Sequence, residues 1–206
     1  MIIQGTPEWF AQRLGKVTAS RVADVIAKTK TGYSTSRANY MAQLVAERLT
    51  GQAAESFSNA AMQHGTETEP LARMAYETET GLMVTEVAMI DHPTIAMSGA
   101  SPDGLVQSDG LVEIKCPNTA THIDTLLYGE APTKYKPQMQ WQMACTGRKW
   151  CDFVSFDPRL PEDMQLFVKR VERDDAYIAE LETEIKQFLS EVETTVQKLI
   201  DLRRAK

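Results

Sequence analysis

The chain is poor in cysteine and histidine, which limits the redox and zinc chemistry it can perform. Its three cysteines, Cys116, Cys145 and Cys151, are odd in number and show no CxxC spacing. This usage argues against a disulfide framework and a structural zinc site, and it fits a reducing compartment. The three histidines are scattered along the sequence. Because none has a second histidine or a cysteine at ligand spacing, we expect structural roles for them.

Long apolar runs are also lacking. No run approaches the length of a membrane span, and the N-terminal MIIQGTPEWF does not have the layout of a signal peptide. We therefore expect a cytoplasmic protein with no membrane contact. A length of 206 residues with 43% apolar and 24% charged side chains predicts one domain, residues 1–206, with a full core.

The chain also lacks an excess of basic residues. The formal net charge is −6, whereas proteins that bind nucleic acid usually carry a basic surface. Acidic residues are dense between Glu180 and Glu193. Basic residues gather in three places: Lys28 and Lys30, Lys134 and Lys136, and Arg148 with Lys149. An uneven distribution of this kind can outweigh the net charge.

The most informative stretch runs from Ser98 to Pro117, SGASPDGLVQSDGLVEIKCP. Two apolar pairs flank a turn-forming Ser-Asp-Gly cluster, which predicts a β-hairpin. Because side chains alternate along a strand, Glu113 and Lys115 share one face, while Val112 and Ile114 share the other. Asp103 enters the same hairpin from the partner strand. The hairpin therefore collects two carboxylates and one lysine.

This set of charges suits Mg²⁺, which takes oxygen ligands and is often held by one or two protein carboxylates together with substrate phosphate. Such an ion activates water and stabilises the charge of a phosphate under attack. The simpler interpretation is a surface hairpin whose charges face solvent.

Asp103 followed by Glu113-Ile114-Lys115 resembles the PD-(D/E)xK nuclease signature. The longer motifs around these residues, GASPDG and GLVEIKCP, resemble those of the phage-type alkaline exonucleases, the λ exonuclease or YqaJ-like viral recombinase family. The resemblance extends from about Trp9 to the strand near Val171. It implies a restriction-endonuclease-like α/β core with a mixed central sheet flanked by helices. It also implies that Asp103 and Glu113 hold Mg²⁺, which Mn²⁺ can replace, with the Ile114 carbonyl as a further ligand, and that Lys115 positions the attacking water.

An upstream segment, Arg13-Leu14-Gly15 and then Thr18-Ala19-Ser20, is similar to the family segment that holds the 5′-phosphate of DNA. The resemblance implies that Arg13 and Ser20, together with Ser101, bind this phosphate; a guanidinium, a hydroxyl and a helix N-terminus suit an anion. The alternative is that Ser20 caps the helix carrying Val22, Val25 and Ile26, while Arg13 faces solvent.

The segment GTETEPLAR resembles the acidic motif of the family, which implies that Glu69 is the third metal-binding carboxylate. Thr66 and Glu69 also have the spacing of a capping box at the start of a helix that ends near Thr80, which would explain Glu69 by itself. Just ahead, Met62 is expected in the core, with a wedge between DNA strands as the other interpretation.

Gln138 follows Pro137 near the start of a predicted helix, 136–147. The family has a glutamine beside the scissile phosphate at the matching position, which implies that role for Gln138; an ordinary polar helix position is the alternative. Many members of the wider superfamily have an aromatic residue four positions later, where this chain has Gln142. Only Gln138 is therefore assigned, and Gln140 stays open.

The remaining pattern predicts helices over 36–49 and about 174–204, a loop over 28–36, and strands over 82–90, 94–97, 151–156 and 164–172. The last helix carries an apolar stripe that packs on the domain or on a neighbouring subunit. The stripe comprises Ile178, Leu181, Ile185, Phe188, Val192 and Leu199.

By resemblance, the expected activity is 5′→3′ exonuclease action on double-stranded DNA ends, which leaves 3′ overhangs for single-strand-annealing recombination. The expected partners are an annealing protein of the Redβ/RecT type and two further copies in a ring-shaped homotrimer. The resemblance also implies a phage or prophage origin in a bacterial cytoplasm. A structure-specific endonuclease or nickase of the same fold is the main alternative, and a non-catalytic DNA-binding module is a third.

Overall fold

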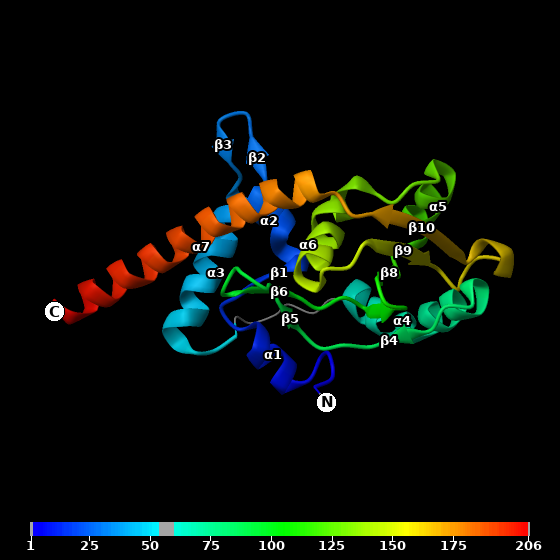
Figure 1. Ribbon diagram of the computed structural model, residues 1–206, viewed down its shortest axis with the longest axis horizontal. Helices are drawn as coiled ribbons and strands as arrows, with labels where there is room; N and C mark the ends of the chain where they lie inside the picture. The colour runs from blue at the N-terminus through cyan, green and yellow to red at the C-terminus, as the bar shows by residue number, and fades with distance from the viewer. Residues whose placement is uncertain (1, 54–59, 206) are drawn as a thin grey trace.

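The structure is a computed structural model that describes residues 2–53 and 60–205, and the side chains of residues 60–62 also lie outside the described part. Two β-sheets lie between helices (Figure 1). This arrangement confirms the expected α/β class with a mixed sheet flanked by helices. Within the described residues, no helix is both long and apolar enough to cross a bilayer.

The larger sheet has five strands in the order β10-β9-β8-β7-β4. These are β4 (Val84–Thr85), β7 (Gly104–Val106), β8 (Gly110–Lys115), β9 (Trp150–Phe156) and β10 (Leu166–Glu172). Strands β8 and β9 are parallel, and the other neighbours are antiparallel. In the β7–β8 pair Leu105 lies opposite Leu111, so the predicted hairpin is confirmed. The strand expected over 164–172 begins two residues later, because Met164 ends a short 3₁₀ helix, Glu162–Met164.

The smaller sheet has the order β1-β6-β5, formed by β1 (Val17–Thr18), β5 (Ile90–Asp91) and β6 (Ser98–Ala100). The strand predicted over 94–97 is wrong, because these residues form a turn. His92 Nδ1 accepts hydrogen bonds from the backbone N–H groups of Thr94 and Ile95, and Met97 has a φ of 61°. Side-chain bonding to the local backbone therefore prevails over strand formation.

Seven α-helices are described: α1 (Pro7–Arg13), α2 (Val22–Ile26), α3 (Thr35–Thr50), α4 (Ala60–Thr80), α5 (Thr119–Tyr128), α6 (Lys136–Thr146) and α7 (Asp175–Arg204). The described residues also form the 3₁₀ helices Ala19–Arg21 and Thr133–Tyr135. The segment 28–36, expected as a loop, contains a short hairpin of β2 (Lys28–Thr29) and β3 (Gly32–Tyr33).

Helix α4 begins well before the position that the sequence suggested. Thr66 lies inside the helix, so it is no N-cap, and the capping-box explanation of Glu69 is wrong. Pro70 also lies inside α4, where it removes one backbone donor. The side chain of Met62 belongs to the part that is not described, so its expected place in the core is not addressed.

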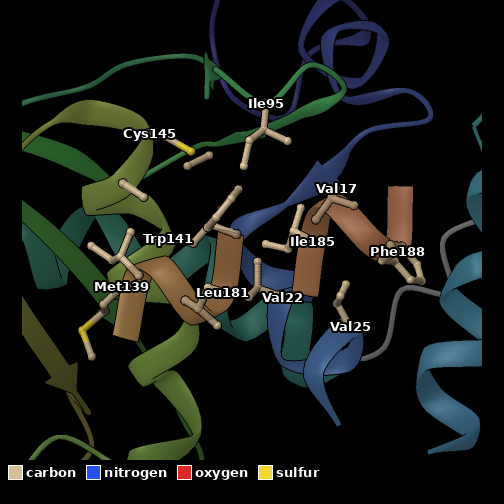
Figure 2. Packing of buried hydrophobic residues seen from close by; sticks show 14 of the residues in the cluster. Val17, Val22, Val25, Ile95, Met139, Trp141, Cys145, Leu181, Ile185 and Phe188 are labelled. Carbon is tan, nitrogen blue, oxygen red and sulfur yellow. The ribbon is translucent and has the colours of Figure 1, made fainter. Parts of the chain in front are cut away.

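The main core lies between α2, α3, α6 and α7. Figure 2 shows Trp141 of α6 and Leu181 and Ile185 of α7 packed together with residues of α2. Helix α7 starts after Asp174, whose side chain accepts a hydrogen bond from the N–H of Tyr177. Its predicted stripe is buried as far as Val192, but Leu199 is 42% exposed, because the C-terminal end of α7 projects beyond the other elements (Figure 1).

A second core forms where α4 packs on the opposite face of the larger sheet. There Ala72 and Tyr76 of α4 meet Val112 and Ile114 of β8. Strand β8 is therefore covered on both faces, which places its charged side chains inside the protein and close to α6.

Candidate active site

Strand β8 brings Glu113 and Lys115 together on one face, as the alternation predicts. Lys115 Nζ lies 2.5 Å from Glu113 Oε1, and the Glu113 side chain is 1% exposed. Burial lowers the pKa of Lys115, but the charges of Glu113 and Asp103 outweigh it and raise that pKa above its ordinary value. The two carboxylates therefore favour the charged form of the lysine. The interpretation as a surface hairpin whose charges face solvent is excluded, because Glu113 is buried.

Helix α6 holds both oxygens of Glu113. Gln138 Nε2 donates to Oε1 at 2.6 Å, and Gln142 Nε2 donates to Oε2 at 2.6 Å. The two glutamines are one helical turn apart, so they point to the same side of α6. Gln138 is half-buried, while Gln142 is fully buried. Gln138 can thus also face a substrate, whereas Gln142 can act only through Glu113.

Asp103 lies directly before β7, across the hairpin from Ile114. Its Oδ2 accepts a hydrogen bond from the backbone N–H of Ile114 at 2.6 Å, which joins the two strands at the site. Burial, followed by the negative charges of Glu113 and Glu69, raises the pKa of Asp103 well above its ordinary value. Asp103 therefore favours its protonated form, and a bound cation would favour its charged form.

Glu69 approaches from α4 and lines a cleft together with Asp103. Arg73, one turn further along α4, lies 3.3 Å from Glu69 Oε1 and also pairs with Glu86. Glu69 is thus the third carboxylate near the hairpin, in an ion pair with its own helix neighbour.

Helix α1 contributes a separate group of donors. Arg13 donates to Ser101 Oγ at 3.1 Å and to Thr18 Oγ1 at 3.5 Å, and its guanidinium stacks on the Trp9 ring, 4.1 Å from the ring centre. Trp9 Nε1 also donates to Ser101 Oγ at 3.0 Å. These hydrogen-bond partners of Arg13 are uncharged, although the negative charge of Glu47 also acts on it. A guanidinium held by hydroxyl groups can still bind an anion.

Ser20 does not take the alternative role of a helix cap. It lies in the 3₁₀ turn Ala19–Arg21, and the N-cap position of α2 is taken by Arg21, so Ser20 is not the helix cap. Its side chain is exposed. The backbone before this turn is held at Thr18, whose N–H donates to the Tyr40 hydroxyl of α3. The hydroxyl of Thr18 contacts Arg13.

The donor set at the site consists of carboxylate oxygens and one backbone carbonyl. Among the described residues, no three His, Cys, Asp or Glu side chains converge as a ready-made metal cluster. Mg²⁺ needs fewer protein ligands than that, because it keeps several waters. Carboxylate oxygens and the raised pKa of Asp103 fit a hard dication, and Asp103, Glu113, Glu69 and the Ile114 carbonyl are the groups that could hold it.

Sequence reasoning missed three contacts at the site, those of Gln142, Trp9 and Thr18. An amide four residues after Gln138 was a usable signal for Gln142, since i and i+4 share a helix face. Gln140, which stayed open, binds the carbonyl of Glu172 and the N–H of Asp174, so it supports the start of α7 rather than the site.

The known proteins that this chain resembles are viral recombinases and exonucleases. Residues 8–149 match the model of the YqaJ-like viral recombinase domain. The crystal structure of an alkaline exonuclease (LHK-Exo) from Laribacter hongkongensis is 60% identical, with a TM-score of 0.91 over 97% of this chain and 99% of that one. A structure of LHK-Exo in complex with dAMP is 61% identical, with a TM-score of 0.92 over the same shares of both chains.

A phage-related exonuclease from Haemophilus somnus 129PT is 18% identical, covers 91% of this chain and 96% of its own, and has a TM-score of 0.68, which supports the fold alone. The comparison with curated proteins gives no match.

Proposed function

Because the chain belongs to the YqaJ-like viral recombinase family, we propose that it is a Mg²⁺-dependent exonuclease that degrades double-stranded DNA in the 5′→3′ direction. The observation that carries this proposal is the meeting of Asp103, Glu113 and Lys115 at one end of the β7–β8 hairpin. The 60% identity to an alkaline exonuclease over nearly the whole chain supports the same reaction class.

In this proposal, Asp103 and Glu113 hold Mg²⁺, with Glu69 and the Ile114 carbonyl as further ligands, and Mn²⁺ can take its place. When bound, the ion makes water a better nucleophile and neutralises charge on the phosphate. Lys115 orients the attacking water through its ammonium group, which lies beside Glu113. Gln138 fixes Glu113 and faces the scissile phosphate.

Water oxygen bonds to phosphorus and gives up a proton to solvent as the bond from phosphorus to the 3′-oxygen breaks, and the 3′-oxygen takes up a proton from solvent. The released 5′-mononucleotide has a 3′-hydroxyl, and the shortened strand keeps a new 5′-phosphate. Arg13 and Ser101 hold the terminal phosphate, since a guanidinium and a hydroxyl that lie in contact suit a phosphate group. The family resemblance assigns Ser20, which is exposed in the 3₁₀ turn Ala19–Arg21, to the same phosphate.

The test compares release of acid-soluble nucleotides from linear and circular duplex with Mg²⁺, and from linear duplexes with 5′-phosphate or 5′-hydroxyl ends. We expect activity on linear duplex only and a preference for 5′-phosphate. Arg13→Ala should reduce the rate on phosphorylated ends by about 10- to 100-fold and remove the preference, because it deletes a charge-assisted hydrogen bond. Lys30→Ala, which removes an exposed lysine at the turn between β2 and β3, is the matched control.

Cleavage of circular duplex would favour the endonuclease alternative instead. Equal slowing of both end types by Arg13→Ala would place the phosphate pocket elsewhere.

The family resemblance also leads us to propose a ring-shaped homotrimer that resects ends to 3′ overhangs for a Redβ/RecT-type annealing protein. Light scattering on the purified protein tests the trimer, and co-purification with such a protein tests the partner. A monomer at micromolar concentration would refute the ring.

A further inference from the structure

The cleft that contains Glu69 and Asp103 is lined by residues of two kinds. Its volume is about 550 Å³, within the range of small-molecule sites. The polar side of its lining comprises Glu69, Arg73 and Asp103. Its apolar side comprises Ile3, Trp9 and Phe10, from the N-terminal segment and α1. The proposed chemistry accounts for the polar side only.

The apolar side is held in place yet exposed. Gln4 donates to the carbonyls of Val87 and Pro102 at 2.9 and 2.8 Å, which fixes the N-terminal segment beside the loop that leads to Asp103. Ile3 is 62% exposed and Phe10 is 46% exposed. An anchored segment that still exposes large apolar side chains has the character of a binding surface.

The two aromatic residues on this side differ in availability. Trp9 is stacked by Arg13, and its ring nitrogen is bonded to Ser101. Phe10 packs against Trp9 in an edge-to-face manner, with the ring centres 4.9 Å apart and the planes at 72°. Trp9 is thus committed to the Arg13–Ser101 group, while Phe10 presents exposed ring surface in the cleft.

We propose that Phe10, with Ile3 beside it, stacks on the base of the 5′-terminal nucleotide while its phosphate groups lie at Arg13 and at the Asp103 site. This inference rests on the proposed function and deepens it by naming a base-binding subsite. A nucleotide has a flat apolar base next to charged phosphate, which matches a cleft lined by both apolar and charged residues. Because every base has a π-face, such a platform accepts all four bases.

The test uses 5′-phosphorylated duplexes that differ only in the terminal nucleotide, which is normal or abasic. Stacking on an aromatic ring is worth roughly 5- to 150-fold in affinity per base. Wild-type protein should therefore cleave the abasic end about ten-fold more slowly under single-turnover conditions. Phe10→Ala should slow the normal end by a similar factor and respond little to base removal. Phe10→Trp should restore the difference, and Phe10→Leu should restore only part of it.

A second readout is independent of cleavage. A terminal 2-aminopurine should lose fluorescence when wild-type protein binds the duplex in EDTA, and it should keep its fluorescence with Phe10→Ala. Tyr128→Ala removes an aromatic residue that is 73% exposed on α5, outside this cleft, and should behave like wild type. Circular dichroism checks that each variant is folded.

Equal sensitivity of wild type and Phe10→Ala to base removal, or equal quenching, would overturn the proposal and assign the apolar side to another ligand. Wild-type protein that cleaves no linear duplex would refute the proposed function instead. The quenching experiment would then decide the base subsite by itself.

Discussion

The carboxylates of the β7–β8 site and those of α7 lie in opposite electrostatic environments. On α7, Glu184 accepts hydrogen bonds from Lys28 and Tyr33, which lower its pKa. At the site, burial and the neighbouring carboxylates Glu113 and Glu69 raise the pKa of Asp103. Along α7, Glu184, Glu191 and Glu193 each lie beside a base, whereas at the hairpin the charges of Asp103 and Glu113 lie close together and share Lys115. Charge therefore stabilises the fold along α7, while at the hairpin the charge of Asp103 opposes folding and is available for chemistry.

This difference also explains how an acidic chain can bind DNA. Glu184, Glu191 and Glu193 of α7 are paired with Lys28, Arg37 and Arg48. Much of the negative charge in the acid-rich segment is thus neutralised locally. The same pairing makes Lys28 less available for phosphate than the sequence suggested, and Lys136 pairs with Asp174 in the same way. Arg13, bonded to hydroxyl groups, is the better candidate for binding an anion.

The largest expected effect comes from neutralising one acid in each region. Asp103→Asn or Glu113→Gln should reduce cleavage by roughly a thousandfold or more, because each removes a proposed metal ligand. Asp103→Asn should not lower the free energy of unfolding without metal, since it relieves repulsion. Glu191→Gln should leave cleavage unchanged and lower the free energy of unfolding by about 1–2 kcal/mol, because the buried Arg37 loses its carboxylate partner.

Single-turnover rates and urea unfolding of the three variants measure both effects. Near-wild-type cleavage by Asp103→Asn would contradict the assignment of the site.

Lysines in the two regions offer a second contrast. Lys115→Ala should reduce turnover by roughly a hundredfold while changing Mg²⁺ affinity much less, because the ammonium acts on water and phosphate charge and does not ligate the ion. Calorimetric Mg²⁺ titration beside single-turnover rates separates the two quantities. Lys28→Ala, which breaks an ion pair with Glu184, should change neither. Equal loss of turnover and Mg²⁺ affinity in Lys115→Ala would identify Lys115 as a structural partner of Glu113.

Two glutamines of α6 sharpen the comparison further. Gln142→Leu removes the hydrogen bond to Glu113 Oε2 and should lower turnover about ten-fold, the usual cost of losing one bond to a charged group. Gln140→Leu, two residues away, removes bonds to the carbonyl of Glu172 and the N–H of Asp174 instead. It should lower stability and leave turnover per folded molecule unchanged. Similar turnover losses in both variants would mean that α6 acts through its general packing.

Some features of the fold and the site could be predicted from the sequence, and others could not. The hairpin was predictable because its signals are local: a turn cluster and alternating side chains, which place Glu113 beside Lys115. The end of α3 at Gly51 and the cap of α7 at Asp174 were predictable for the same reason.

Long-range contacts decided the rest. Thr66 has capping-box spacing, yet α4 continues through it, and the helix packs on the sheet through Ala72 and Tyr76. Ser20 has the right type for a cap, yet β1 and the bond from Thr18 N–H to Tyr40 set a 3₁₀ turn there. The role of Gln142 requires knowing that α6 lies against β8. Such information is absent from the local pattern, so tertiary packing overrides it.

The smallest expected effect concerns Asp157, a fully buried acid that belongs to the paired class although it follows β9 of the active-site sheet. Burial by itself raises its pKa, but hydrogen bonds from Arg159 and Thr119 outweigh burial and lower it to about 2. A carboxyl whose folded pKa lies below its unfolded value stabilises the fold above the unfolded value, near 4, and loses this contribution as the pH falls toward 2. Because Arg159 is half exposed, the contribution is on the order of 1–2 kcal/mol.

Asp157→Asn should therefore be less stable than wild type by about this amount at pH 7, and the difference should shrink as the pH falls from 5 to 2. Urea unfolding at several pH values measures it, with Asp163→Asn, an exposed acid of the 3₁₀ helix Glu162–Met164, as the control for unspecific charge effects. A difference that stays constant with pH would show that Asp157 stabilises the fold through its packing. Its charge would then contribute nothing, and Asp157 would leave the class of paired acids that α7 represents.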